Sequence, residues 1–147
     1  MIKLYTIGFT NKSAERFFEL LEHNQIVKII DTRINNVSQL SGFAKAKDLE
    51  FFARRLSGIN YEHKPDFAPT KELLDAYRNK RISWIDYSKE YIRLLEERNV
   101  GIYPSQIEQL HNSCLLCSEH SPEQCHRKLL AEFLKQKYPE IQIIHLK

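Results

Sequence analysis

The sequence is poor in the residues that mark nucleotide-binding loops and disulfide frameworks: its 147 residues include four glycines, five prolines and three cysteines. It contains no Gly-x-Gly-x-x-Gly and no Gly-Lys-Ser/Thr, which excludes the dinucleotide fingerprint and the P-loop. No apolar run reaches the roughly 20 residues of a membrane-spanning helix, so we expect no membrane contact. The first residues hold too few apolar side chains for a signal peptide, which predicts a cytoplasmic protein.

Composition indicates one folded domain over residues 1–147. Hydrophobic residues make up 42% of the chain and charged residues 28%, which is typical of globular proteins and not of disordered ones. The 22 lysines and arginines exceed the 19 aspartates and glutamates, for a net charge of +3. This surplus is compatible with a phosphate-bearing small molecule or a nucleic acid as partner but does not require one. Composition does not indicate the oligomeric state.

Apolar strand-like runs alternate with segments of helical periodicity along the whole chain. The runs interpreted as strands are 2–7, 26–30, 59–63, 113–117 and 141–146. Helices are expected at 47–56, 70–79, 83–98 and 104–111, in one segment that Ser13 caps, and from 121 to about 137. Residues 121–124, Ser-Pro-Glu-Gln, combine a capping serine with proline at the first helical position. This alternation predicts an α/β fold: a single three-layer Rossmann-like domain with a mainly parallel sheet flanked by helices.

Residues 114–127 carry the richest chemistry of the chain. They contain all three cysteines and two of the six histidines. An odd, clustered set of cysteines is not a disulfide framework; in a reducing compartment such cysteines are buried, catalytic or metal-binding. The segment brings thiol, carboxylate, imidazole and guanidinium groups to the passage from a strand into a helix. Open α/β sheets bind their ligands at such a place.

Polar residues also follow the other predicted strands, and parallel strands bring their carboxyl ends to one edge of the sheet. Gly8, Thr10 and Asn11 follow the first strand, while Asp31 and Arg33 follow the second. Because Asp31 and Arg33 lie two residues apart, they point to the same side of an extended chain. We expect Asp31 to act as a base or to bind a hydroxyl while Arg33 holds an anion; the alternative is a solvated ion pair.

The start of the last predicted helix suits an anion as well, because its free N–H groups and positive dipole end attract negative charge. We predict that a phosphate, sulfate or carboxylate binds near residues 121–124, or against Arg127 and Arg33. His126 and Arg127 would then hold the anion. Arg127 could also pair with Glu119. We expect Asp31, Arg33, Glu119 and Arg127 to line one cleft, with a carboxylate–guanidinium contact among them.

The cysteines leave several roles open. The positive end of the helix dipole favours a thiolate at Cys125. The alternative, which we weigh equally, is that Cys125 packs in the core as a small hydrophobic residue. Cys114, Cys117, Cys125 and His126 together resemble a zinc-binding set. In a strand, however, Cys114 and Cys117 face opposite sides and cannot share one ion. We therefore predict no bound metal and a buried Cys114.

Several segments, in their order along the chain, resemble the bacterial "domain of unknown function 488" family. They are 5–11, 31–33, 42–43, 58–61, 115–119 and 125–127. The resemblance implies a compact three-layer α/β domain and gives no reaction. It maps the recurrent polar positions of that family onto Gly8, Thr10, Asp31, Arg33, Tyr61, Cys117, Glu119, Cys125, His126 and Arg127. Cys114 lies outside the pattern, which also weighs against zinc.

The candidate site residues divide by role. The candidate catalytic residues are Asp31, Cys117, Glu119 and Cys125. The candidate binding residues are Gly8, Thr10, Asn11, Arg33, Tyr61, His126 and Arg127. Tyr61 is included because it lies near the predicted edge, where it could stack on a base or a sugar.

Three functions remain open on these grounds, and no cofactor is indicated. The first is an enzyme that acts on a phosphorylated small molecule, a nucleotide or a nucleic-acid end through a carboxylate/arginine site. The second is a non-catalytic nucleic-acid-binding or regulatory module, which would show salt-dependent binding. The third is a thiol or zinc protein that uses Cys117, Cys125 and His126.

Overall fold

The computed structural model of the chain describes residues 1–35, 42–101, 104–119 and 122–147. Five strands run through it: β1 (Ile2–Gly8), β2 (Lys28–Asp31), β3 (Asn60–His63), β4 (Ser113–Cys117) and β5 (Ile141–His145). Five α-helices accompany them: α1 (Ala14–His23), α2 (Ala46–Ser57), α3 (Lys71–Arg78), α4 (Trp84–Glu97) and α5 (His126–Lys137). Short 3-10 turns lie at Gly42–Ala44, Pro65–Phe67 and Pro104–Leu110.

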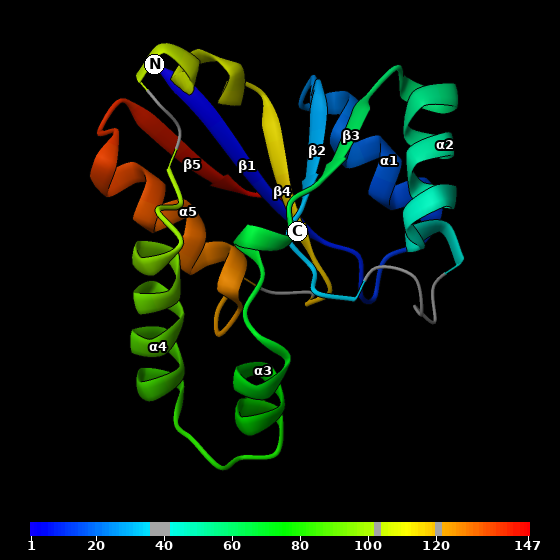
Figure 1. Ribbon diagram of the computed structural model, residues 1–147. Coiled ribbons are helices and arrows are strands. Elements are labelled where there is room, and N and C mark those ends of the chain that lie inside the picture. Colours follow the sequence, from blue (N-terminus) through cyan, green and yellow to red (C-terminus); the bar gives the residue numbers. More distant parts are fainter. Residues whose placement is uncertain (36–41, 102–103, 120–121) are drawn as a thin grey trace.

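The strands form one sheet in the order β3-β2-β4-β1-β5, and all the recorded pairings are parallel. Helices α1 and α2 cover one face, and α4 and α5 cover the other (Figure 1). The predicted three-layer α/β fold is therefore confirmed. The central strand β4 pairs with β1 on one side, Gly8 opposite Cys117, and with β2 on the other, Asp31 opposite Leu116.

Side chains alternate between two cores along each strand, as the pleat requires. In β4, Cys114 and Leu116 face the core under α1 and α2, whereas Leu115 faces the core under α4 and α5. Cys114 is fully buried, as predicted. The alternation leaves Cys117 on the α5 side, at the end of the strand where the sheet stops.

Local signals explain where most helices begin and end. The Ser13, Thr70 and Ser83 side chains accept hydrogen bonds from the first-turn N–H groups of α1, α3 and α4. Gly58 ends α2 with φ of 63°, a left-handed conformation that glycine adopts at no steric cost.

The predicted start of the last helix is wrong. Helix α5 begins at His126, and Cys125 is its N-cap with an extended backbone. Residues 122–124 form a tight turn in which the Cys125 N–H donates to the Pro122 carbonyl at 3.2 Å. Gln124 has φ of 56°, which no helix tolerates. The expected cap, Ser121, lies outside the described residues.

Helices α3 and α4 form a hairpin that extends beyond the carboxyl edge of the sheet (Figure 1). Helix α3 has no buried residue, and it packs on α4 through the Tyr77 ring, whose centroid lies 5.5 Å from that of Trp84 and 5.0 Å from that of Tyr87. Within the described parts of the chain, every helix is too short or too polar to cross a bilayer.

Candidate functional site

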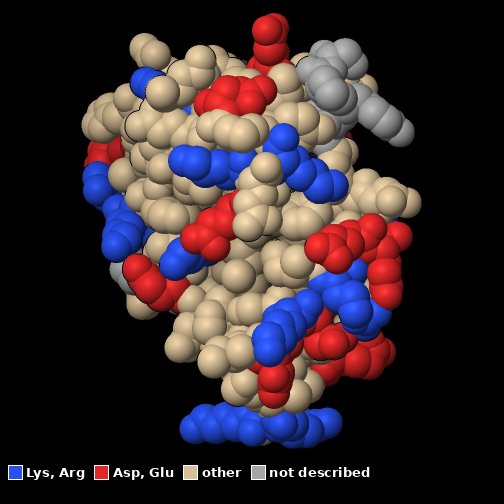
Figure 2. All heavy atoms as spheres, turned by 90° about the vertical axis from the view of Figure 1, so that its left-hand side faces the viewer, with Lys and Arg blue, Asp and Glu red and all other residues tan. Residues whose placement is uncertain are grey.

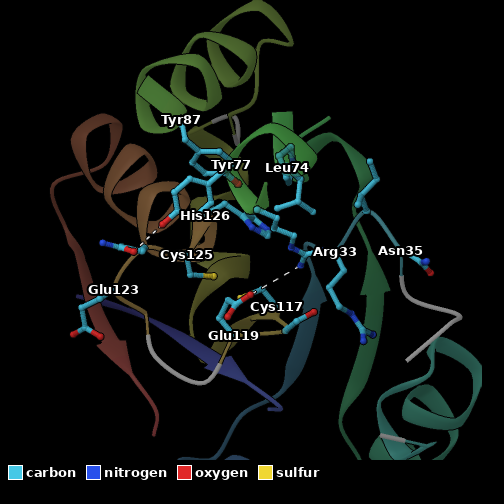
Figure 3. Close-up of a pocket in the computed structure, with 15 residues that line it drawn as sticks. Arg33, Asn35, Leu74, Tyr77, Tyr87, Cys117, Glu119, Glu123, Cys125 and His126 are labelled. Carbon is cyan, nitrogen blue, oxygen red and sulfur yellow. Dashed lines mark hydrogen bonds and ion pairs between the residues drawn. The ribbon is translucent and has the colours of Figure 1, made fainter. Parts of the chain in front are cut away.

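A cavity of about 420 Å³ opens at the carboxyl edge of the sheet, where the sequence predicts the site (Figure 3). Its walls come from the segments after β2 and β4, the start of α5, and the α3–α4 hairpin. The lining residues are Arg33, Ile34, Asn35, Pro69, Leu74, Tyr77, Arg78, Tyr87, Cys117, Ser118, Glu119, Glu123, Gln124, Cys125 and His126.

Topology explains why a cavity forms there. The chain leaves β4 toward α5 on one face of the sheet, whereas it leaves the neighbouring strands β1 and β2 toward α1 and α2 on the other face. The connections diverge at the end of β4, and open α/β sheets bind ligands in the crevice that such a divergence leaves.

Cys117 lies at the centre of a buried cluster of two thiols and one guanidinium. The Nη1 atom of Arg127 donates to Cys117 Sγ at 3.0 Å and lies 3.9 Å from Cys125 Sγ. The same nitrogen donates to the Glu119 carbonyl at 2.5 Å. Arg127 has no exposed surface, whereas Cys117 and Cys125 border the cavity.

The three cysteines have different pKa values because their surroundings differ. Burial alone would raise the pKa of Cys117, but a hydrogen bond from the Cys125 thiol and the adjacent Arg127 charge lower it to about 7. Burial and the neighbouring Cys117 raise the pKa of Cys125 well above its usual value. Burial likewise raises the pKa of Cys114 far above its usual value. Of the three thiols, Cys117 therefore ionises most readily.

Gly8 lets the segment after β4 cross the end of β1. A Cβ atom on Gly8 would lie 1.4 Å from the Glu119 carbonyl oxygen and 2.7 Å from Arg127 Nη1. Thr10 fixes the same segment, because its backbone N–H donates to the Ser118 carbonyl at 3.1 Å and its hydroxyl donates to that carbonyl too. Asn11 is exposed, with φ of 61°, in the turn that follows. Gly8 and Thr10 thus hold the thiol cluster in place.

Asp31 and Arg33 form a buried pair on the α1/α2 side of the sheet. Asp31 Oδ1 accepts hydrogen bonds from Arg33 Nε at 2.8 Å and from its backbone N–H at 3.1 Å. Asp31 Oδ2 accepts from Arg33 Nη2 at 2.8 Å and from the Tyr61 hydroxyl at 2.5 Å. The pair is buried, so the alternative of a solvated ion pair is wrong.

The Arg33 guanidinium packs over the Phe9 ring at 5.3 Å from its centroid. Its Nη1 atom has no hydrogen-bond partner among the residues that the structure describes.

Of the four residues expected to line one cleft, Arg33 and Glu119 line it, and Asp31 and Arg127 lie buried behind it. The Asp31–Arg33 pair is the carboxylate–guanidinium contact that the sequence predicted. The Glu119 carboxylate does not meet Arg127, which binds its backbone carbonyl instead. It is exposed and lies 4.0 Å from Nη2 of Arg78 on α3.

His126, the first residue of α5, is directed into the protein. Its Nε2 lies 2.9 Å from the Thr32 carbonyl, to which it donates in the neutral ring, and 3.1 Å from the Thr32 hydroxyl. Its ring meets Tyr91 edge-on at 5.6 Å, and burial lowers its pKa to about 4. Outside residues 36–41, 102–103 and 120–121, no three His, Cys, Asp or Glu side chains are grouped to hold a metal ion.

Comparison with models of known protein families finds a match for this chain. The family model described as "Domain of unknown function DUF488" matches residues 13–134. The chain belongs to this family. The match confirms the resemblance inferred from the motifs. It includes the Asp31–Arg33 pair and the whole of 114–127 but not Gly8 or Thr10. Searches of curated proteins and of solved structures found no significant match.

The structure adds four residues to the site that lie outside the sequence motifs on which the family resemblance was based. Tyr77, Arg78 and Tyr87 come from the α3–α4 hairpin, and Lys12 follows the turn after β1. Lys12 is almost wholly buried, and burial, together with the nearby Arg127 and Arg16 charges, lowers its pKa. Tyr77, Arg78 and Tyr87 carry no local signal, because they reach the site through long-range packing and not through a strand end.

Proposed function

We propose that the chain is an enzyme that acts on a phosphate-bearing small molecule, nucleotide or nucleic-acid end, with the Cys117 thiolate as the reacting group. One observation carries the proposal: Cys117 borders the cavity, and Arg127 Nη1 lies 3.0 Å from its sulfur. A cysteine whose thiolate is favoured by an adjacent positive charge is typical of nucleophilic catalysis. The proposal includes a cytoplasmic location, where its three free cysteines stay reduced.

The anion would bind on the hairpin side of Cys117. Arg78 borders the cavity, and its side chain is 55% exposed, so its loose contact with Glu119 can give way to a phosphate. The amino end of α5 opens on the same cavity through Cys125 and His126, and the Cys125 side chain makes no capping bond there. A helix amino end and a guanidinium together form a suitable phosphate site.

The remaining groups would assist from fixed positions. The Glu119 carboxylate is exposed at the cavity and suits proton transfer to or from a leaving group. Cys125 donates a hydrogen bond to the Cys117 thiolate and would keep it oriented. Asp31 has both oxygens occupied by Arg33 and Tyr61, so we propose that it supports the edge of the sheet and does not act as a base.

Residue-specific alkylation tests the reactive group. Iodoacetamide should modify Cys117 with a rate that rises through pH 7, while Cys114 stays unmodified in the folded protein. Cys125→Ala should move the Cys117 midpoint upward, because the hydrogen bond from Cys125 lowers its pKa. Equal alkylation of Cys117 and Cys114 would contradict the proposal.

Turnover tests the reaction itself. A mixture of nucleotides, sugar phosphates and 5′-phosphorylated oligonucleotides is incubated with the protein and followed by mass spectrometry. Cys117→Ser should abolish any conversion, whereas the matched control Cys114→Ser should keep it, because Cys114 lies away from the cavity. Conversion that survives Cys117→Ser would remove the thiolate from the reaction.

The outer face of α2 favours a second candidate, a nucleic-acid-binding module. Phe51 is 55% exposed, and the Arg55 guanidinium lies 5.9 Å from its ring centroid. Lys47 and Arg54 extend this face, and exposed aromatic rings beside basic groups suit single strands. The face over α4 and α5, by contrast, mixes positive and negative side chains (Figure 2). Binding of a labelled oligonucleotide that falls with salt and with Phe51→Ala would support this candidate.

A further inference from the structure

We infer that the ligand of the Cys117 cavity carries a planar aromatic ring beside its phosphate, as a nucleotide does. The ring would pack against the α3 wall of the cavity, and the phosphate would meet Arg78 and the start of α5. This inference rests on the proposed function and names the substrate class of the same site.

The cavity has two chemically different walls. The wall from the hairpin region is mainly apolar and aromatic, with Pro69, Leu74, Tyr77 and Tyr87, and Arg78 lies beside them. The wall from the strand ends and the start of α5 is mainly polar and includes Arg33, Cys117, Glu119 and Gln124. Figure 3 shows Leu74 and Tyr77 on one side of the cavity and Cys117 and Glu119 on the other. A ligand with one apolar planar end and one anionic end matches both walls.

The aromatic wall is held in position before any ligand arrives. The Tyr77 hydroxyl donates to Gln124 Oε1 at 2.7 Å, which ties α3 to the turn before α5. The Tyr77 ring also packs on Trp84 and Tyr87, whose rings stack at 5.2 Å with an interplanar angle of 19°. Tyr77 is therefore a fixed aromatic surface, and such surfaces stack on any base because every base has a π-face.

Chain connectivity places the anion site next to the ring site. Arg78 follows Tyr77 directly, and its guanidinium reaches the Glu119 carboxylate at 4.0 Å. Glu119 lies two residues after Cys117, and its carbonyl shares Arg127 Nη1 with the thiolate. A ligand whose ring packs against Tyr77 would therefore place its phosphate near Arg78 and its reacting atoms near Cys117. The cavity of about 420 Å³ lies in the range of roughly 300–1,000 Å³ that small ligands occupy.

Calorimetry on the full chain tests ring recognition. The ligands are AMP, GMP, CMP and UMP, and the comparison ligands are ribose 5-phosphate and inorganic phosphate. We expect the nucleotides to bind at least about tenfold more tightly than ribose 5-phosphate, the scale of one stacked base. Trp84, the only tryptophan, lies against Tyr77 and Tyr87, so its emission should change with nucleotides and not with inorganic phosphate.

Variants locate the effect. Tyr77→Leu should remove most of the preference for nucleotides and leave ribose 5-phosphate binding unchanged, whereas Tyr77→Phe should keep the preference. Tyr138→Leu is the matched control, since it removes a tyrosine ring at the end of α5 that does not line the cavity. Arg78→Gln should weaken nucleotides and ribose 5-phosphate alike. Thermal unfolding of each variant establishes that it is folded.

The outcomes separate this inference from the proposed function. Binding of ribose 5-phosphate within about twofold of the nucleotides would overturn ring recognition and leave the thiolate enzyme standing. Absence of all binding at millimolar concentration would overturn the inference, while Cys117 alkylation would still report on the reactive group. Tighter binding of a 5′-phosphorylated oligonucleotide than of any mononucleotide, if Tyr77→Leu removes it, would support the ring site and identify a nucleic-acid end as its ligand; if Tyr77→Leu leaves it unchanged, the ring inference is wrong.

Discussion

At the scale of single residues, the surroundings of each side chain decide its chemistry. Cys114 and Cys117 lie on the same strand, yet one points into an apolar core and the other meets a buried guanidinium. His126 and Arg127 are adjacent, but the histidine donates to a carbonyl on β2's continuation while the arginine holds the thiols. The types of these four residues indicated a site, but only their packing shows which of them contact the thiol cluster and which lie in the core.

His126 gives a pH dependence of stability that can be measured. Burial lowers its folded pKa to about 4 from an ordinary value of 6.5, so the unfolded chain binds the proton first as pH falls. Stability should therefore drop between pH 6.5 and 4, by on the order of 3 kcal/mol in full. His126→Gln, which can still donate to Thr32, should lose this dependence. Urea unfolding from pH 7 to 4 measures both proteins, and parallel curves would contradict the assignment.

At the scale of elements, the α3–α4 hairpin contains one loosely and one firmly held helix. Helix α3 has no buried residue, whereas α4 buries Tyr87, Tyr91 and Leu95. The caps of the two helices are alike, because Thr70 and Ser83 each accept a hydrogen bond at 3.1 Å from an N–H three residues later. The same loss of a cap should thus have different consequences in each helix.

We expect Ser83→Ala to lower the free energy of unfolding by about 1 kcal/mol, because α4 belongs to the core. Thr70→Ala should change global stability less and instead speed hydrogen exchange within α3, which opens without unfolding the core. Chemical denaturation and native-state hydrogen exchange distinguish the two effects. Equal global losses would show that α3 and α4 unfold as one unit.

The elements also show how far sequence reasoning reaches. Apolar runs predicted all five strands, with the bounds of Ser113–Cys117 correct and the second strand starting at Lys28, not at residue 26. Strand direction then placed Cys117 and Arg33 at the cavity. The start of α5 was misplaced because Gln124 is held by Tyr77, 47 residues earlier, in a turn with the same local composition as a helix start. Tyr77 and Arg78 were missed for the same reason.

At the scale of the whole molecule, β4 joins two halves of the sheet. Strands β3 and β2 lie on one side of it, and β1 and β5 lie on the other. Strand β1 hydrogen-bonds only to β4 and β5 in the sheet order, both of which come more than 100 residues later. The amino-terminal strand therefore has no sheet partner until β4 is in place.

This order predicts that a fragment of residues 1–112 does not fold. It would retain β2 and β3 but leave β1 unpaired and both cores without Cys114, Leu115 and Leu116. Near-ultraviolet circular dichroism and urea titration of the fragment measure this, with the full chain as control. A cooperative unfolding transition in the fragment would show that the half without β4 is stable alone.

The projecting hairpin has a consequence for how this fold can diversify. It supplies the aromatic wall and Arg78, while the thiolate, its guanidinium and Gly8 belong to the sheet edge and α5. Under the proposed function, reactivity and ligand recognition would therefore reside in separate pieces of the chain. Exchanging residues 70–83 for another loop should leave the Cys117 thiolate intact and alter which molecules reach it. Helix α3 would then be the part of this fold that varies with the ligand, while the sheet edge and α5 stay the same.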